Sequence, residues 1–98
     1  MTKIVWSGRS RNQFDKIYQY WIIHNNSKYY SEKILDETLR IINLLKSQIH
    51  IGQKSNHKEI RRVLILDKFS LSYRITPKEI KIVSFFDNRR DPKKNTHK

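Results

Sequence analysis

The strongest chemical signal in this sequence is a basic cluster that follows an apolar run near its C-terminal end. Residues 80–86 are mostly apolar, and Arg89, Arg90, Lys93 and Lys94 follow them within a few positions. A strand that ends in guanidinium groups can hold phosphate, or the carboxylates of an acidic protein segment. Because an isolated basic run is just as often a solvated tail, the interpretation depends on the rest of the chain.

Further cations are expected on one face of a sheet. Between residues 69 and 75 the apolar side chains alternate with Ser70, Ser72 and Arg74, so this second set should face away from the core. Arg61 and Arg62 are adjacent and therefore point to opposite faces, so one of them reaches the same side. We predict a partner-binding or nucleic-acid-binding surface that comprises Arg61, Arg62, Arg74, Arg89, Arg90, Lys93 and Lys94.

The composition is consistent with an anionic partner. The 98 residues carry a net charge of +12, and the half from residue 50 onward holds thirteen of the 21 basic side chains. Absence of cysteine excludes disulfides and thiolate chemistry and fits a reducing compartment. No signal-like apolar core or membrane-length apolar stretch is present. We therefore expect a cytoplasmic protein without a membrane partner.

Catalysis, if there is any, should need no metal and no cofactor. The four histidines are scattered, without ligand spacing, and two glycines are too few for a phosphate-binding loop. RNA cleavage without a metal needs a base, cations for the phosphorane charge and an acid. His57 or Glu59 could be the base, although Glu59 is more simply explained as an exposed carboxylate beside a lysine. For such a nuclease the candidate residues are Glu59, Arg62, Arg74 and Arg90.

The apolar periodicity predicts two helices and then a sheet. Apolar residues recur at helical spacing after Ser10, which forms a capping-box pattern with Gln13. Gly52 is expected to end the second helix in a left-handed conformation. The predicted elements are a strand at 3–6, helices at about 10–25 and 28–49, and strands at 59–66, 69–76 and 79–86.

These elements define an α+β fold with the order β-α-α-β-β-β. A helical hairpin should pack on one face of an antiparallel sheet, because few polar residues separate the helices and the last three strands form a meander. One domain is expected over residues 1–94, followed by a flexible basic tail at 95–98. Residues expected to be substantially buried are Trp6, Phe14, Ile17, Trp21, Ile41, Leu45, Leu71, Tyr73 and Ile82.

An ordered set of short segments resembles the RelE/ParE superfamily of bacterial toxins over residues 3–94. The set comprises Lys3-Ile4-Val5-Trp6, Ile51-Gly52, Ile60-Arg61, Tyr73-Arg74-Ile75 and Asp87-Asn88-Arg89-Arg90-Asp91-Pro92. The resemblance implies the toxin half of a type II toxin–antitoxin module. Its partner would be a small antitoxin that wraps the toxin with an extended or helical segment, with an acidic part that pairs with the arginines.

Members of this superfamily differ in the cellular target on which the toxin acts. RelE-type toxins cut messenger RNA on the ribosome with basic residues on the open sheet face, whereas ParE-type toxins poison DNA gyrase. Here Ser70 stands where the nucleolytic relatives usually carry a cation, and no tyrosine or histidine closely follows Arg90. The resemblance therefore implies a ParE-like gyrase inhibitor. The alternatives are a RelE-like, metal-independent and ribosome-dependent mRNA endonuclease, and a degenerate antitoxin-binding module without toxicity.

Overall fold

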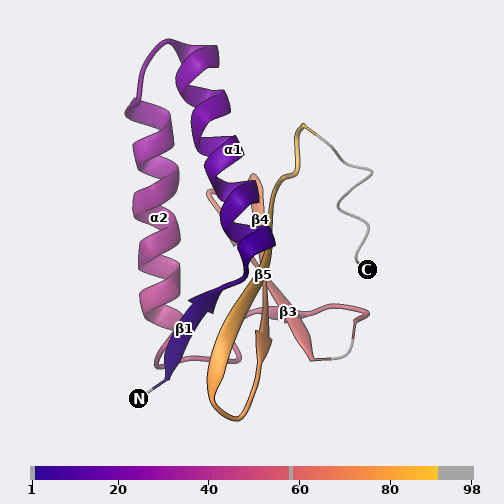
Figure 1. The fold of residues 1–98 in the computed structure, drawn as a ribbon. Coiled ribbons are helices and arrows are strands. Elements are labelled where there is room, and N and C mark those ends of the chain that lie inside the picture. The colour runs from indigo at the N-terminus through magenta and orange to yellow at the C-terminus, as the bar shows by residue number, and fades with distance from the viewer. Residues whose placement is uncertain (1, 58, 91–98) are drawn as a thin grey trace.

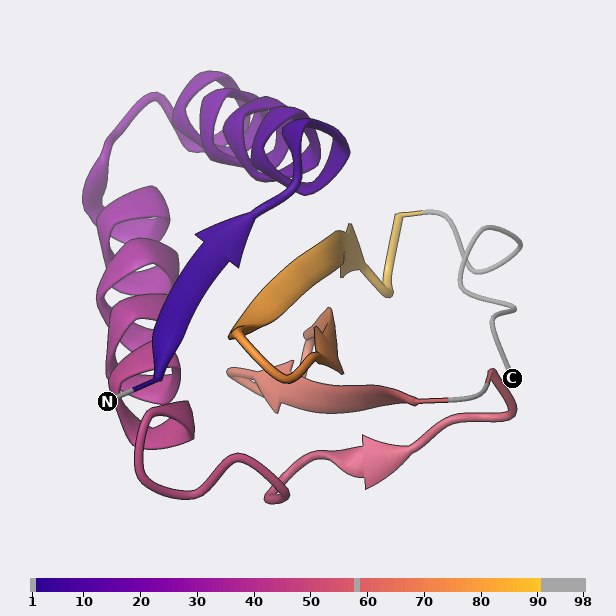
Figure 2. The same ribbon diagram turned by 60° about the horizontal axis from the view of Figure 1, so that its bottom comes forward.

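The computed structural model describes residues 2–57 and 59–90, in which two helices pack on a five-stranded mixed sheet (Figure 1). Strand order is β1-β5-β4-β3-β2. Figure 2 shows both helices on the same side of the strands, with β1 running beside α2 to the start of α1. The elements are β1 (Lys3–Trp6), α1 (Gly8–Asn25), α2 (Tyr29–Leu45), β2 (Gln53–Lys54), β3 (Ile60–Ile65), β4 (Phe69–Ile75) and β5 (Glu79–Asp87).

Helix α1 begins two residues earlier than its sequence pattern predicted, because Ser7 is the N-cap. The Ser7 Oγ accepts a hydrogen bond from the Ser10 backbone N–H at 3.0 Å. Ser10 is buried instead, and its Oγ donates to the Ile82 carbonyl at 2.9 Å. Gln13 accepts a hydrogen bond from the Phe85 N–H through its side-chain oxygen. The capping-box prediction was therefore wrong, since both side chains tie α1 to β5.

The second helix ends at Leu45, earlier than predicted, and Gly52 does not end it. No glycine of the described chain has a positive φ. A Cβ on Gly52 would lie 2.7 Å from the Tyr73 Oη and 3.0 Å from the Arg61 Cβ, so the chain needs glycine there for close approach. The Gly52 N–H donates to the Tyr73 hydroxyl, which itself donates to the Ile49 carbonyl. Glycine is therefore required at position 52 by the close contact with Tyr73 and Arg61, and not by a left-handed helix cap.

The meander has the predicted order, and two further features complete the sheet. β1 pairs in parallel with β5, opposite residues 79–82, and the short strand β2 extends the far edge beyond β3. The β3–β4 hairpin turns at Leu66 and Asp67, which both have positive φ values, as a type I′ turn requires. A register shift at Ser72/Tyr73 marks a bulge between β4 and β5.

The core lies between the helices and the inner face of the sheet. Seven of the residues predicted to be buried are buried: Phe14, Ile17, Ile41, Leu45, Leu71, Tyr73 and Ile82. Trp6 and Trp21 are half-buried instead. Trp6 lies on the edge strand, where one side of its ring has no neighbouring strand. Trp21 packs against the edge of the core, and its ring N–H donates to the buried Asp87 at 3.0 Å.

Candidate anion-binding surface and the arginine network beside it

A small pocket on the sheet face away from the helices gathers cations that are distant in the sequence. We call it the open-face pocket. Its volume is about 220 Å³, and its lining residues are Arg9, His57, Ile60, Ser72, Arg74, Val83 and Ser84. Ser72 and Ser84 are opposite each other on β4 and β5, and both are buried. Two guanidinium groups and an imidazole thus stand beside two hydroxyl groups, and the lining contains no carboxylate.

The charge around Arg74 is not neutralised within the described residues. Arg74 lies directly opposite Lys81 on the neighbouring strand, and like charges in that position repel each other. In the part of the chain that the structure describes, neither side chain belongs to an ion pair. An anion in or beside the open-face pocket would relieve this repulsion, so the geometry suits phosphate or carboxylate.

A second hollow adjoins the first at the start of β3. This edge hollow, of about 450 Å³, is lined by His50, Lys54, Ser55, His57, Glu59, Ile60, Arg61 and Ile75. His57 and Ile60 line both hollows, so they form the ridge between them. Glu59 is exposed and has a φ of 66°, and its backbone turns the chain sharply into β3.

Arg61 is held on the inner side of β3 by backbone carbonyls of the segment that follows α2. Its Nη1 donates to the Gly52 carbonyl at 2.8 Å and to the His50 carbonyl at 3.3 Å. Beside it, burial raises the pKa of the Tyr73 hydroxyl, although the Gly52 N–H and the Arg61 charge act in the opposite direction. Arg61, Tyr73 and Gly52 therefore form a structural anchor for the segment that follows α2.

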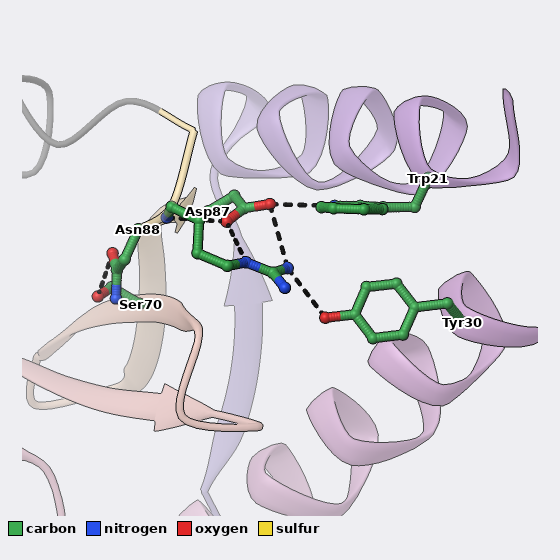
Figure 3. A network of polar contacts seen from close by, with 6 residues as sticks. Trp21, Tyr30, Ser70, Asp87 and Asn88 are labelled. Atoms are coloured by element: carbon green, nitrogen blue, oxygen red, sulfur yellow. Dashed lines mark hydrogen bonds and ion pairs between the residues drawn. The ribbon is translucent and has the colours of Figure 1, made fainter. Parts of the chain in front are cut away.

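A polar network that includes Trp21, Tyr30 and Asp87 connects the end of β5 to both helices (Figure 3), and its hydrogen bonds place Arg89 within it. The Arg89 Nε lies 3.2 Å from an oxygen of Asp87, and its Nη2 donates to the Tyr30 hydroxyl at 2.9 Å. The guanidinium carbon lies 4.7 Å from the centre of the Trp21 ring and 5.2 Å from that of Phe69. Burial opposes the charge, but these hydrogen bonds outweigh it and raise the pKa of Arg89.

Arg90 and its neighbours lie away from the open-face pocket. The Arg90 guanidinium carbon is 3.5 Å from the centre of the Tyr20 ring, and that ring stacks on His24. Ser70 is fully buried and donates to the Asn88 side chain at 2.9 Å (Figure 3). The end of β5 is thus engaged with α1 and β4.

The structure places the candidate nuclease residues in different surroundings. Arg74 lines the open-face pocket and Glu59 lines the edge hollow. Arg62 is half-buried and is paired in register with Ser72, whereas Arg90 lines neither hollow. The partner-binding role of these residues and of Arg61 and Arg89 stays a prediction, and Lys93 and Lys94 lie outside the described residues.

Two cations of this surface were missed by sequence reasoning. Arg9 lies in the first turn of α1 and reaches the open-face pocket only because α1 is tied to β5 through Ser10. No local pattern signals such a contact. Lys81 could have been found, since its strand alternates and a β4–β5 meander places it near Arg74.

Within residues 2–57 and 59–90 no three His, Asp or Glu side chains gather as a metal site would require. None of the helices there combines the length and apolarity needed to cross a membrane.

Solved structures share this fold at low sequence identity. A chain of the chromosomal ParDE toxin–antitoxin system of P. aeruginosa is similar with a TM-score of 0.75 and 19% identity, over 89% of this chain and 96% of that one. A chain of the E. coli DinJ–YafQ complex gives 0.63 and 15%, over 91% and 96%. YoeB, described as a dimer from Staphylococcus aureus, gives 0.60 and 16%, over 85% and 92%.

These likenesses establish the fold class. The chain has the fold of RelE/ParE-type toxins, so the resemblance seen in its sequence is confirmed at the level of fold. No protein-family model and no curated protein sequence matches the chain.

Proposed function

We propose that this chain is the growth-inhibiting toxin of a type II toxin–antitoxin module, that a cognate antitoxin neutralises it, and that it acts on DNA gyrase as ParE-type toxins do. The observation that carries the proposal is the likeness to the P. aeruginosa ParDE chain, which extends over nearly the whole of both chains. The TM-score of that likeness, 0.75, is higher than the 0.63 and 0.60 of the DinJ–YafQ and YoeB structures.

The side chains at the end of β5 also support gyrase rather than RNA as the target. The resemblance implies that a nuclease of this fold usually carries a cation at the position of Ser70 and an acid shortly after Arg90. Ser70 is buried against Asn88, and Arg90 stacks on Tyr20. Loss of one electrostatic group commonly lowers a catalytic rate by about a hundredfold or more. A chain without both groups would therefore cleave RNA poorly.

A second candidate, ribosome-dependent cleavage of messenger RNA, is favoured by one specific observation. The open-face pocket brings together Arg9, Arg74 and His57, which are cations for a phosphorane and a group able to transfer a proton. In this alternative Arg74 would steady the scissile phosphate. Neither Ser70 nor Arg90 would take part.

The two candidates predict opposite results with one protein preparation. Purified chain should inhibit DNA supercoiling by gyrase and leave ribosome-bound messenger RNA intact. Cuts positioned within codons that vanish in Arg74→Ala would refute the gyrase target and establish the alternative. A chain that neither arrests growth when induced alone nor affects either target, but still binds the product of a neighbouring gene, would be a degenerate binding module.

The antitoxin is expected to be acidic where it meets Arg74 and Lys81. These two side chains lie opposite each other, and no described carboxylate neutralises either of them. Arg61 and Arg89 are bound internally, so their reversal to glutamate should weaken the complex mainly by destabilising the toxin. Reversal of Arg74 should weaken the complex in a correctly folded toxin, which an isothermal titration with the antitoxin would measure.

A further inference from the structure

Two serine hydroxyl groups in the open-face pocket have no hydrogen-bond partner within the described residues. Ser72 and Ser84, which lie directly opposite each other on β4 and β5, are only 8% and 5% exposed. No side-chain oxygen of the described chain is fully buried without a partner, so these two hydroxyl groups open onto the pocket that both residues line. A nearly buried hydroxyl group in such a position is stabilised by a ligand that accepts its hydrogen bond.

The bulge between β4 and β5 brings a cation to the same face as these hydroxyl groups. The register skips Val83, which is therefore an additional residue of β5. In a regular strand Lys81 and Ser84 would face opposite sides of the sheet, because they are three positions apart. The additional residue turns both of them to the open face, where Lys81 lies opposite Arg74.

The positive end of α1 borders the same pocket. Arg9 in the first turn lines the pocket and Arg11 follows it, whereas this turn contains no acidic side chain. Cations at the start of a helix are unfavourable, because the helix dipole is positive there. Neither arginine belongs to an ion pair within residues 2–57 and 59–90. An anion in the pocket would therefore offset an unfavourable charge of α1 as well as the repulsion between Arg74 and Lys81.

The anion that these groups suit is a phosphate of a nucleic-acid backbone. Arginine and lysine side chains, serine hydroxyl groups and helix N-termini are the groups with which proteins bind such phosphates. The pocket brings all of them together, and its lining contains no aromatic ring. Unstacked single strands are held mainly by bases that stack on aromatic rings. A pocket without such rings therefore suits the backbone of a stacked duplex.

We propose that the open-face pocket binds a backbone phosphate of duplex DNA, so that the chain holds the DNA on which gyrase acts without cleaving it. Ser72 and Ser84 would donate hydrogen bonds to the phosphate oxygens. Arg9 and Arg74 would neutralise the phosphate charge, and Lys81 would lie beside it. The choice of DNA rests on the proposed function, whereas the phosphate site rests on the contacts of the pocket itself.

The charge of the pocket can be tested with the full chain and a short labelled DNA duplex, followed by fluorescence anisotropy at several salt concentrations. Arg74→Gln should weaken binding about tenfold and reduce the slope of log affinity against log salt concentration by about one, because one phosphate contact is lost. Lys33→Gln removes an exposed cation of α2 and is the control for net charge. Equal affinities and slopes of the two variants would overturn the proposal.

A serine variant separates the pocket from diffuse attraction to a chain of net charge +12, since it changes no charge. Ser84→Ala should bind the duplex about tenfold more weakly, because a hydrogen bond to a charged group is lost. Its melting temperature should be unchanged or higher, because the hydroxyl group has no partner within the described residues of the free chain. Equal DNA affinities of Ser84→Ala and the native chain would overturn the proposal.

Ser70→Ala is the matched control on the same strand. Ser70 is fully buried, but its hydroxyl group donates to the Asn88 side chain at 2.9 Å. This variant should therefore have a lower melting temperature and keep its DNA affinity. A loss of DNA affinity equal to that of Ser84→Ala would overturn the pocket as the site.

Two further ligands identify the source of the phosphate. Inorganic phosphate that shifts the NMR amide signals of Ser72 and Ser84, in a chain that binds no duplex, would overturn DNA as the ligand. Single-stranded RNA that binds more tightly than the duplex, with the same loss in Ser84→Ala, would also overturn it and would support the nuclease alternative.

The outcomes separate this proposal from the proposed function. Duplex binding that depends on Ser84, in a chain that does not inhibit gyrase, would refute the proposed target and support the phosphate site. Gyrase inhibition by a chain whose DNA affinity is unaffected by Ser84→Ala would refute the phosphate site alone.

Discussion

Replacement of Tyr73 by phenylalanine should reveal how strongly one hydroxyl group stabilises this fold. Tyr73 is fully buried in β4, and its hydroxyl accepts from the Gly52 N–H at 2.9 Å and donates to the Ile49 carbonyl at 2.8 Å. Phenylalanine keeps the ring and removes both bonds. Gly52 is buried, so its N–H would be left without a partner, whereas half-buried Ile49 can turn its carbonyl partly to water.

The magnitude follows from those two groups. A buried donor without an acceptor costs about 1–3 kcal/mol, and the partly hydrated carbonyl adds less. We expect Tyr73→Phe to lower the free energy of unfolding by about 2–3 kcal/mol. For a domain of this size that corresponds to a decrease in melting temperature of roughly 10–20 °C. Urea unfolding followed by circular dichroism measures the first quantity, and a thermal scan measures the second.

Tyr18→Phe is the matched control. Tyr18 is half-buried, and its hydroxyl forms no hydrogen bond within the described chain. Removal of that hydroxyl should change the free energy of unfolding by less than about 0.5 kcal/mol. If Tyr73→Phe were as stable as Tyr18→Phe, then water would be able to replace the Tyr73 hydroxyl. The account of the segment after α2 as anchored by this group would then be refuted.

The same residue gives a prediction for alkaline pH. The folded chain holds the pKa of Tyr73 above its ordinary value, chiefly through burial, so the neutral phenol is the form that folding favours. Its contribution is complete below the ordinary tyrosine pKa of about 10 and is lost as the pH rises toward the higher value of the folded state. Native protein should therefore lose stability above about pH 10 more steeply than Tyr73→Phe does, as stability measured across that range would show.

Three further substitutions test separate parts of the structure. Gly52→Ala should lower the free energy of unfolding by about 1–3 kcal/mol, because the added Cβ would crowd its neighbours. At Gly8 a Cβ meets nothing within 4 Å, so Gly8→Ala should not destabilise the fold, and urea unfolding curves of the two variants test the difference. Arg89→Lys should lower the free energy of unfolding by about 1–2 kcal/mol and alter tryptophan fluorescence, because lysine lacks the planar guanidinium that contacts Trp21, Tyr30 and Asp87. A variant with native fluorescence and native stability would contradict this. Arg74→Glu should weaken antitoxin binding. It should also stabilise the free chain by a few tenths of a kcal/mol, because the new glutamate would lie opposite Lys81. A loss of stability would refute the repulsion between Arg74 and Lys81.

Periodicity in the sequence was sufficient to predict the architecture. The change from helical spacing to alternation after residue 52 gave the helical hairpin and the β3–β4–β5 meander in the observed order. Errors concern features that depend on contacts distant in the sequence. β2 consists of two residues that pair with Arg61 and Arg62, and its polar sequence resembles a loop. The end of α2 was misplaced because Gly52 was explained by its own φ rather than by its contact with Tyr73.

The candidate site was less predictable than the fold, and the reason is physical. A basic cluster in a sequence does not reveal which arginines find acceptors within their own chain. Arg61 donates to backbone carbonyls and Arg89 to Asp87 and Tyr30, whereas Arg74 stays free of such bonds within the described residues. Arg9 joins Arg74 through the packing of α1 on β5, which no local pattern encodes.

Pairing of the first strand with the last also constrains how the chain folds during synthesis. β1 has its partner in residues 79–82, and α1 is connected to β5 through Ser10 and Gln13 across 72 positions. A nascent chain that lacks β5 has neither the strand that β1 needs nor the carbonyl that Ser10 needs. Contacts of this length slow folding. The fold can therefore form only after residues 79–87 have been synthesised, and a chain that stops before them would lack the pocket where Arg9 meets Arg74.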